Sequence, residues 1–162
     1  MKILIKKTHK DSKIPKRANS GDAGRDAYIV SFCTPSMEEG EKTLVEANKD
    51  TYVLKPLERV GCRLGFATAI PEGFFFHVVP RSGLALWEGL SIVNTPGIID
   101  PGYRNEWMAV VVNLSNKEVT LKKGERICQI ILTKMYDYDF EEVEELPTSE
   151  RGQGGFGSTG KT

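Results

Sequence analysis

The sequence has few of the side chains that most nucleophilic and metal-dependent catalysis uses. It contains only two histidines, His9 and His77, and three cysteines, Cys33, Cys62 and Cys128, without a C-x-x-C pair. A cysteine nucleophile needs a neighbouring base, and a disulfide framework needs paired cysteines. We therefore expect three buried, inert thiols in a reducing compartment, and chemistry carried by other side chains.

The chain also lacks a long apolar run and an excess of charge of one sign. No apolar run approaches the ~20 residues of a membrane span, and residues 1–7 (MKILIKK) have no signal-peptide core. The 22 Lys and Arg residues balance the 22 Asp and Glu residues, so no net field draws the chain to nucleic acid or an anionic membrane. We expect a cytoplasmic protein without a nucleic-acid or membrane partner. The basic stretch 1–17 and the acidic stretch 137–150 are solvated ends or, for the first, a functional arm.

The apolar pattern is strand-like along most of the chain. Residues 59–70 alternate between apolar and small or charged side chains, and β-branched or aromatic runs occupy 74–79, 106–114 and 126–132. Only residues 82–89 (SGLALWEG) predict a turn or two of helix. Short strands at this spacing, bounded by Pro and Gly turn signals, predict an all-β sandwich or barrel.

Polar segments interrupt and then end this pattern. Residues 34–50 predict a long loop or a hairpin excursion, and residues 139–146 (DFEEVEEL) have too few apolar side chains to anchor a helix. From about Pro147 the chain is rich in glycine and cannot offset its ordering entropy by burial, which predicts a mobile tail. We therefore divide the chain into a β domain over residues 1–146 and a C-terminal arm over residues 147–162.

The arm contains a match to the phosphate-binding loop G-x-x-x-x-G-K-T at residues 155–162. That loop holds phosphates because a strand precedes it and a helix starts at its Gly-Lys-Thr end. No helix follows Thr162 in this sequence. We expect the match to reflect a shared use of bare glycine N–H groups and not a nucleotide-binding loop of that class.

Four polar residues have both a structural and a chemical interpretation. Asp100 lies in an Asp-Pro-Gly turn, where it can accept local N–H bonds or, as an ionised carboxylate, orient and deprotonate a water. Asp26 is likewise a turn residue or a ligand of a metal's water shell. Arg81, followed by Ser-Gly, forms a surface ion pair or binds phosphate oxygens. Gln129, in an apolar strand, is either an edge residue or a ligand contact.

The order and spacing of five segments are much more specific than any one residue. SGDAGRDAY, PRSGLAL, NTPGIIDPGY, ERICQIIL and RGQGGFGSTG together resemble the five signature motifs of the trimeric dUTPases, the deoxyuridine triphosphate nucleotidohydrolases. The resemblance covers residues 20–160. It implies a jelly-roll-like, distorted β-barrel with one short helix and a flexible glycine-rich arm, in a homotrimer with active sites at the subunit interfaces. It also implies hydrolysis of dUTP to dUMP and pyrophosphate with Mg²⁺, which limits uracil in DNA.

The resemblance further implies roles for individual residues. Asp100 matches the catalytic aspartate that positions the water attacking the α-phosphorus, Asp26 the acid that holds Mg²⁺ through water, and Tyr103 the ring that packs under deoxyribose. The remaining substrate-binding positions are Arg81, Ser82, Gly83 and Gln129 for the phosphates, Asn94, Gly97, Ile98 and Ile99 for uracil, Met108 for a further contact, and Arg151, Phe156, Gly157 and Ser158 in the arm.

Two other functions are alternatives at this point. A dCTP deaminase of the same fold shares the Ile-Asp-Pro-Gly turn but carries a catalytic glutamate on the next strand, where this chain has Val110. Its Arg-Ser-Ser…Arg motif is also interrupted here, by Gly83 and Leu86. A non-catalytic nucleotide-binding β-barrel would have lost some of the reactive side chains, yet this sequence retains every motif residue that has a chemical role.

Overall fold

The computed structural model describes residues 1–38 and 40–155 of the chain. Along these residues lie thirteen strands and one short helix, which confirms the all-β class. In chain order they are β1 (Leu4–Lys7), β2 (Arg25–Tyr28), β3 (Ser31–Glu38), β4 (Glu41–Ala47), β5 (Thr51–Leu54), β6 (Arg59–Arg63), β7 (Phe66–Ala69), β8 (Phe74–Pro80), α1 (Ser82–Glu88), β9 (Leu90–Ile92), β10 (Gly97–Ile99), β11 (Met108–Asn113), β12 (Val119–Lys122) and β13 (Arg126–Lys134).

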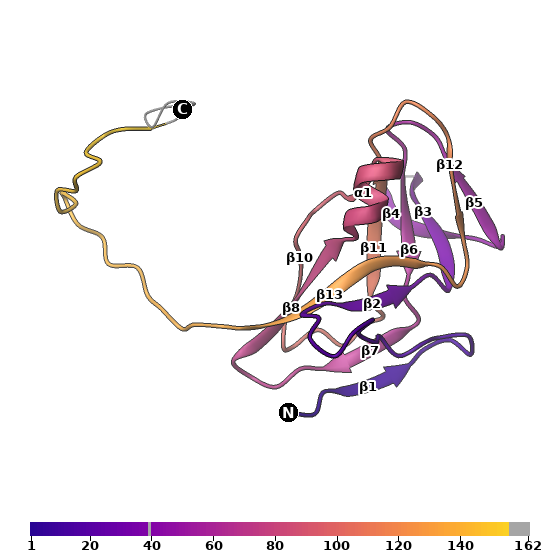
Figure 1. Ribbon diagram of the computed structural model, residues 1–162, viewed down its shortest axis with the longest axis horizontal. Helices are drawn as coiled ribbons and strands as arrows, with labels where there is room; N and C mark the ends of the chain where they lie inside the picture. Colours follow the sequence, from indigo (N-terminus) through magenta and orange to yellow (C-terminus); the bar gives the residue numbers. More distant parts are fainter. Residues whose placement is uncertain (39, 156–162) are drawn as a thin grey trace.

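The strands form antiparallel sheets around one core (Figure 1). A five-stranded sheet has the order β4-β3-β6-β11-β9, a four-stranded sheet has the order β10-β8-β13-β2, and two small sheets pair β1 with β7 and β12 with β5. Among the described residues these sheets do not join into one closed barrel. The fold is jelly-roll-like, as expected, with the sheets packed against each other by their apolar faces.

Large aromatic side chains fill the space between the sheets. Trp107, Phe32 and Phe66 are fully buried, and the rings of Phe66 and Phe76 lie 5.1 and 5.2 Å from the Trp107 ring, measured between centroids. Burial of rings of this size is a dominant favourable contribution to folding. Because Trp107 directly precedes β11, its burial also fixes the end of the loop that follows β10.

The alternating residues 59–70 form two strands, a break that the apolar pattern does not reveal. β6 ends at Arg63 and β7 begins at Phe66. Between them Gly65 has a φ of +74°, a conformation that glycine adopts without steric cost, and a Cβ there would lie 2.8 Å from a methyl group of Val30. The glycine therefore redirects the chain from the five-stranded sheet to the β1-β7 pair.

The polar excursion is a hairpin. β3 and β4 pair from Phe32 opposite Ala47 to Glu38 opposite Glu41. β3 also pairs with β6, whereas β4 lies at the edge of the five-stranded sheet. Of the two structures that the sequence allowed for this segment, the hairpin is confirmed.

The C-terminal segment leaves the folded body after β13 (Figure 1). Residues 135–155 form neither helix nor strand and are exposed throughout, including the acidic stretch 139–146. The backbone N–H of Met135 still donates to the Gly73 carbonyl, at 2.8 Å. None of the helical structure in residues 1–38 and 40–155 has the length and apolarity needed to cross a bilayer.

A buried asparagine links three segments at the end of β11. The Asn113 side chain is fully buried; its Nδ2 donates to the carbonyls of Leu54 (2.9 Å) and Lys117 (2.7 Å), and its Oδ1 accepts from Ser115 N–H (2.9 Å) and Oγ (2.7 Å). Every hydrogen-bonding position of the amide is thus used. A buried polar group that loses its partner costs far more than an exposed one.

We expect Asn113→Ala to lower the free energy of unfolding by about 3 kcal/mol, because it leaves several buried backbone groups without partners. The exposed Asn116 provides a matched control, and Asn116→Ala is expected to change stability by less than about 0.5 kcal/mol. Urea unfolding monitored by tryptophan fluorescence, to which the buried Trp107 contributes, measures both values. A similar midpoint for the two variants would contradict this role of Asn113.

Candidate active site

The four-stranded sheet carries most of the residues that the sequence singles out. Asp26 lies in β2, Gln129 in β13 and Ile98 in β10, and Arg81 directly follows β8. In the register of this sheet Gln129 is opposite Asp26 on one side and opposite Val79 on the other. β13 is therefore an interior strand, so the interpretation of Gln129 as an edge residue is wrong.

Asp26 is held between two arginines. Arg81 Nε donates to Asp26 Oδ1 at 3.2 Å and Arg126 Nη1 donates to Oδ2 at 3.0 Å, while the Asp26 side chain is only 6% exposed. Arg81 Nη1 also donates to the Arg126 carbonyl, at 3.4 Å. Two guanidinium groups around one carboxylate leave a net charge of one positive unit, which favours an anion at their open side.

Arg126 is a site residue that the sequence analysis missed. It lies within the ERICQIIL segment, but its partner Asp26 is 100 positions away. Nothing in local spacing connects the two residues. The one sequence signal for Arg126 is that a second arginine lies in the same segment as Gln129, for which a phosphate contact is expected.

An open groove of about 570 Å³ lies beside these arginines, with Lys122, Tyr28 and Leu84 among its other lining residues. Ser82 and Gly83 begin α1 next to it, and both are exposed. A Cβ added to Gly83 would meet no atom within 4 Å, so its backbone is open to an approaching ligand. A guanidinium, a hydroxyl and unshielded N–H groups together suit phosphate oxygens.

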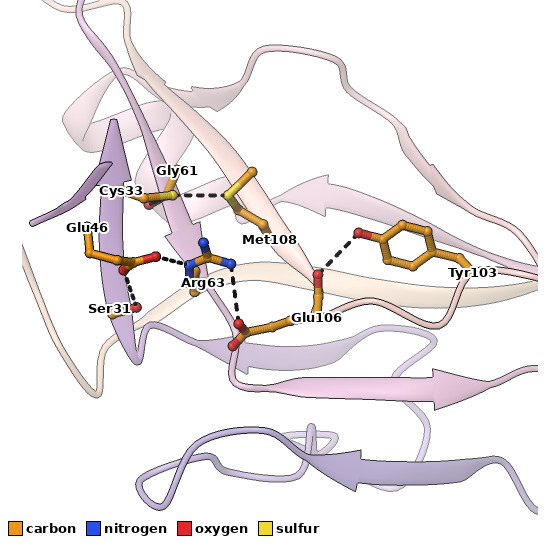
Figure 2. A network of polar contacts seen from close by, with 8 residues as sticks. All are labelled: Ser31, Cys33, Glu46, Gly61, Arg63, Tyr103, Glu106 and Met108. Carbon is orange, nitrogen blue, oxygen red and sulfur yellow. Dashed lines mark hydrogen bonds and ion pairs between the residues drawn. The ribbon is translucent and has the colours of Figure 1, made fainter. Parts of the chain in front are cut away.

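The turn after β10 presents the candidate catalytic acid. Asp100 is exposed, and its backbone carbonyl accepts a hydrogen bond from Tyr103 N–H at 3.1 Å. The Tyr103 hydroxyl donates to the Glu106 carbonyl at 3.2 Å, and the ring remains 39% exposed (Figure 2). Arg104 donates to the carbonyls of Pro101 and Tyr103 and so braces the same turn. The exposed carboxylate and the exposed ring face solvent from one rigid turn.

The candidate base-reading segment precedes this turn. Gly97, Ile98 and Ile99 pair with Val78, His77 and Phe76 of β8. Gly97 is buried, and a Cβ there would lie 3.4 Å from the Val78 side chain and 3.5 Å from Asn94 Nδ2. Ile98 is half exposed, so it lies on the accessible side of β10. These are ordinary contact distances, so the pairing of β10 with β8 is what holds the backbone of this segment.

Met108 lies at the start of β11 and points toward the β3–β4 hairpin (Figure 2). Cys33 Sγ lies 3.3 Å from Met108 Sδ, and a Cβ on Gly61 would be 2.6 Å from both sulfurs. The substrate contact expected of Met108 stays a prediction. Burial raises the pKa of the Cys33 and Cys62 thiols, and burial followed by the charge of Asp26 raises the pKa of Cys128 to about 12. The three cysteines are buried and free, which confirms the predicted burial, while their lack of reactivity stays a prediction.

Asp100 and Arg81 lie at opposite ends of β8. Ile99, the residue before Asp100, pairs with Phe76, and Arg81 follows the other end of the strand. Phe76 and Arg81 are five positions apart, roughly 17 Å along an extended strand. Within one chain, the candidate water-activating acid Asp100 and the candidate phosphate-binding Arg81 therefore lie far apart.

Comparison with known proteins identifies the family. The dUTPase family model matches residues 44–160 of this chain. The chain belongs to the dUTPase family.

Full-length relatives support this membership. The chain is 39% identical to the deoxyuridine 5'-triphosphate nucleotidohydrolase of Hydrogenobaculum sp. over 99% of both chains, and 41% identical to the enzyme of that name from Fusobacterium nucleatum over 99% of both chains. Among solved structures it is similar to the Staphylococcus bacteriophage 80alpha dUTPase with dUpNHpp, with a TM-score of 0.77, 27% identity and 98% of each chain covered. A mutant dUTPase of phage phi11, described with a structural Mg(II) ion, shares the fold at 20% identity, covering 91% of this chain and 100% of that one, with a TM-score of 0.71.

The arm of this dUTPase is described only at its start. Arg151 Nε donates to the Gly154 carbonyl at 2.9 Å and Nη2 to the Gly155 carbonyl at 3.4 Å, which curls residues 151–155 into a local turn. The guanidinium is exposed and touches only its own segment. Phe156, Gly157 and Ser158 lie outside the described residues.

Asp26 is a single carboxylate between two arginines, so it fits a magnesium ion only through a water molecule. Within residues 1–38 and 40–155 no group of three or more His, Cys, Asp or Glu side chains converges on one point. Mg²⁺ keeps several waters and is commonly held by one or two carboxylates together with substrate phosphates. Each Asp26 oxygen accepts one arginine bond and retains a second lone pair, so it fits a ligand water of an ion that the phosphates bind.

Proposed function

We propose that this dUTPase hydrolyses dUTP to dUMP and pyrophosphate by water attack on the α-phosphorus. The observation that carries the proposal is an exposed Asp100 in a hydrogen-bonded turn, in a chain whose relatives, aligned over 99% of its length, are named deoxyuridine 5'-triphosphate nucleotidohydrolases. Asp100 accepts a proton from the water as the new O–P bond forms. The bond between the α-phosphorus and the bridging oxygen breaks, and pyrophosphate leaves with its negative charge.

The phosphates bind on the side of the sheet where Arg81 lies. Arg81 and Ser82 donate to phosphate oxygens, Gly83 contributes its N–H, and Gln129 contacts the same group. Because Arg126 also binds Asp26, Arg81 can turn from Asp26 to a phosphate while the buried carboxylate keeps one cationic partner. Such an exchange avoids leaving a buried charge unpaired, which is costly.

The sugar and the base bind at the turn after β10. The Tyr103 ring lies flat under deoxyribose and leaves no room for a 2′-hydroxyl. Asn94 and the backbone from Gly97 to Ile99 hydrogen-bond uracil, in a segment too tight to accept a methyl group at C5. Met108 supplies a further contact near the sugar.

The complete site is built by more than one subunit. Asp100 and Arg81 lie at opposite ends of β8, so a nucleotide on Tyr103 of one chain reaches the phosphate-binding arginine of a neighbouring chain. A homotrimer with three sites at its interfaces satisfies this separation. The arm, residues 147–162, then covers the bound nucleotide, with Arg151 on the phosphates, Phe156 on the base, and the backbone around Gly157 and Ser158 near the phosphates.

Asp26 would hold a magnesium ion through a water molecule, and the bound ion would supply charge neutralisation to the phosphate oxygens. Arg126 keeps the Asp26 carboxylate in place to accept the hydrogen bond of such a water.

Deamination of dCTP is the weaker alternative. The position of the deaminase glutamate is occupied by Val110, which pairs with Gly61 inside the five-stranded sheet and cannot transfer a proton. A non-catalytic binding barrel is weaker still, because the reactive side chains are present and Asp100 is exposed.

Substrate selectivity provides the test. We expect rapid pyrophosphate release from dUTP and at least about 100-fold lower kcat/KM for UTP and dTTP, because the rejection is steric. The measurement is coupled pyrophosphate detection with each nucleotide, with dCTP included and its product examined for deamination. Comparable rates with dUTP, UTP and dTTP, or conversion of dCTP to dUTP, would refute the proposed function.

A further inference from the structure

One arginine joins the β3–β4 hairpin to the loop that carries Tyr103. Arg63, at the end of β6, donates from Nε to Glu46 Oε1 of β4 at 2.5 Å and from Nη1 to Glu106 Oε2 at 3.4 Å (Figure 2). Ser31 Oγ of β3 lies 3.4 Å from the second oxygen of Glu46. The guanidinium is thus fixed between two carboxylates that come from different parts of the chain.

Glu106 relates this ion pair directly to Tyr103. The backbone carbonyl of Glu106 accepts the Tyr103 hydroxyl at 3.2 Å, while its side chain is bound by Arg63. The next residue, Trp107, is fully buried and accepts a hydrogen bond from Leu64 N–H, next to Arg63, at 2.9 Å. The Glu106 carbonyl is therefore oriented from both sides, by the Arg63 ion pair and by the buried tryptophan.

The strands beneath this network leave little freedom for it to shift. The side chains of Cys33 of β3 and Met108 of β11 meet over Gly61 of β6, with their sulfurs 3.3 Å apart, and a Cβ at Gly61 would lie 2.6 Å from both sulfurs. β6 pairs with β3 on one side and with β11 on the other, so the three strands are held together at this level. We therefore expect a substitution of Arg63 to displace the Glu106 carbonyl and the Tyr103 ring without displacing the strands of the sheet.

We propose that Arg63 is a positioning residue for substrate selection, which holds the Tyr103 ring in place for deoxyribose by fixing Glu106 from the β3–β4 hairpin. The inference rests on the proposed function of Tyr103. Arginine is suited to this task because its planar fork binds two carboxylates at once, whereas lysine offers a single charged point. Arg63 touches no reacting atom, so its effect is on the sugar-binding geometry.

The test compares Arg63→Met with Arg59→Met in the full-length chain. Arg59 is an exposed arginine on the same strand, four positions earlier, without an ion pair in the described part of the chain. We expect Arg63→Met to lower the ratio of kcat/KM for dUTP to kcat/KM for UTP about tenfold, mostly through a higher KM for dUTP, because small misplacements of binding groups have effects of this order or larger. Arg59→Met is expected to keep the wild-type ratio.

The ratio of kcat/KM for dUTP to kcat/KM for UTP distinguishes a misplaced Tyr103 ring from a loss of stability. A purely structural defect reduces the amount of active enzyme and scales both substrates equally, so the ratio stays constant. An unchanged ratio in Arg63→Met, with a melting temperature like that of wild type, would overturn the inference. If Arg63→Met does not fold, Glu106→Gln replaces it, because this near-isosteric change weakens the ion pair, and the ratio is expected to fall in the same direction.

A double-mutant cycle tests the route through the tyrosine hydroxyl. In a Tyr103→Phe background the bond to the Glu106 carbonyl is already absent, so adding Arg63→Met should lower the ratio by less than about twofold. A full additional tenfold loss would contradict the route. Wild-type protein in the same assay distinguishes the proposed function from the role of Arg63. Failure of the wild type to release pyrophosphate from dUTP refutes the proposed function, whereas wild-type activity with an unaltered ratio in the variants refutes only the role of Arg63.

Discussion

Replacing Asp100 with asparagine is expected to abolish nearly all hydrolysis of dUTP while leaving the fold intact. The carboxylate accepts the proton of the attacking water, and an amide of the same shape cannot do so. General-base contributions are typically 10²–10⁴-fold, so we expect kcat to fall by a factor in that range. The side chain is exposed, and only the backbone carbonyl of Asp100 bonds to Tyr103, so the turn does not depend on the charge.

Two measurements accompany this variant. Binding of the analogue dUpNHpp, followed by calorimetry, is expected to remain within a few-fold of wild type. The matched control is Asp50→Asn, an exposed acid that pairs with Lys123 at 3.3 Å outside the candidate site, and it is expected to retain full activity. An Asp100→Asn enzyme that works within a few-fold of wild type would exclude Asp100 as the base.

Ending the chain after Glu150 is expected to cause a loss of activity of similar size by a different route. The arm excludes water and adds donors to the phosphates when substrate is bound, and we expect its removal to lower kcat/KM by about 100-fold or more. Among the described residues that this truncation removes, 151–155, the hydrogen bonds go to one another and to the Ser149 carbonyl, so the melting temperature and the oligomeric mass are expected to remain unchanged.

Single substitutions in the arm distinguish its contact with the base from its contact with the phosphates. Phe156→Ala is expected to lose part of the binding energy, because stacking of an aromatic ring on a base contributes roughly 1–3 kcal/mol. Arg151→Ala is expected to weaken triphosphate binding more than monophosphate binding. A truncated protein with full activity would mean that the arm has no catalytic role.

Much of the fold is predictable from the sequence because strands and turns are encoded by neighbouring residues. The runs at 74–79 and 126–132 correspond to β8 and β13, the segment SGLALWEG to α1, and the polar excursion to the β3–β4 hairpin. The break between β6 and β7 depends on the contact of Gly65 with Val30, which lies 35 positions earlier, so the alternation of apolar residues cannot reveal it.

The site is only partly predictable for the same reason. Asp26, Arg81, Asp100 and Tyr103 are visible in short motifs, but the pairing of Asp26 with Arg126 joins residues 100 positions apart. The connection from Glu46 through Arg63 to Glu106 likewise requires β4, β6 and the loop before β11 to be brought together. Ion pairs of this kind have no local pattern, because any exposed arginine or glutamate in the sequence has the same appearance.

The direct test of the central claim is hydrolysis of dUTP in ¹⁸O-labelled water, with mass spectrometry of both products. Water attack on the α-phosphorus, assisted by Asp100, predicts one ¹⁸O atom in dUMP and none in pyrophosphate. Label in the pyrophosphate would place the attack on the β-phosphorus, and the absence of dUMP and pyrophosphate would mean that the chain does not catalyse this reaction. Either result would contradict the account.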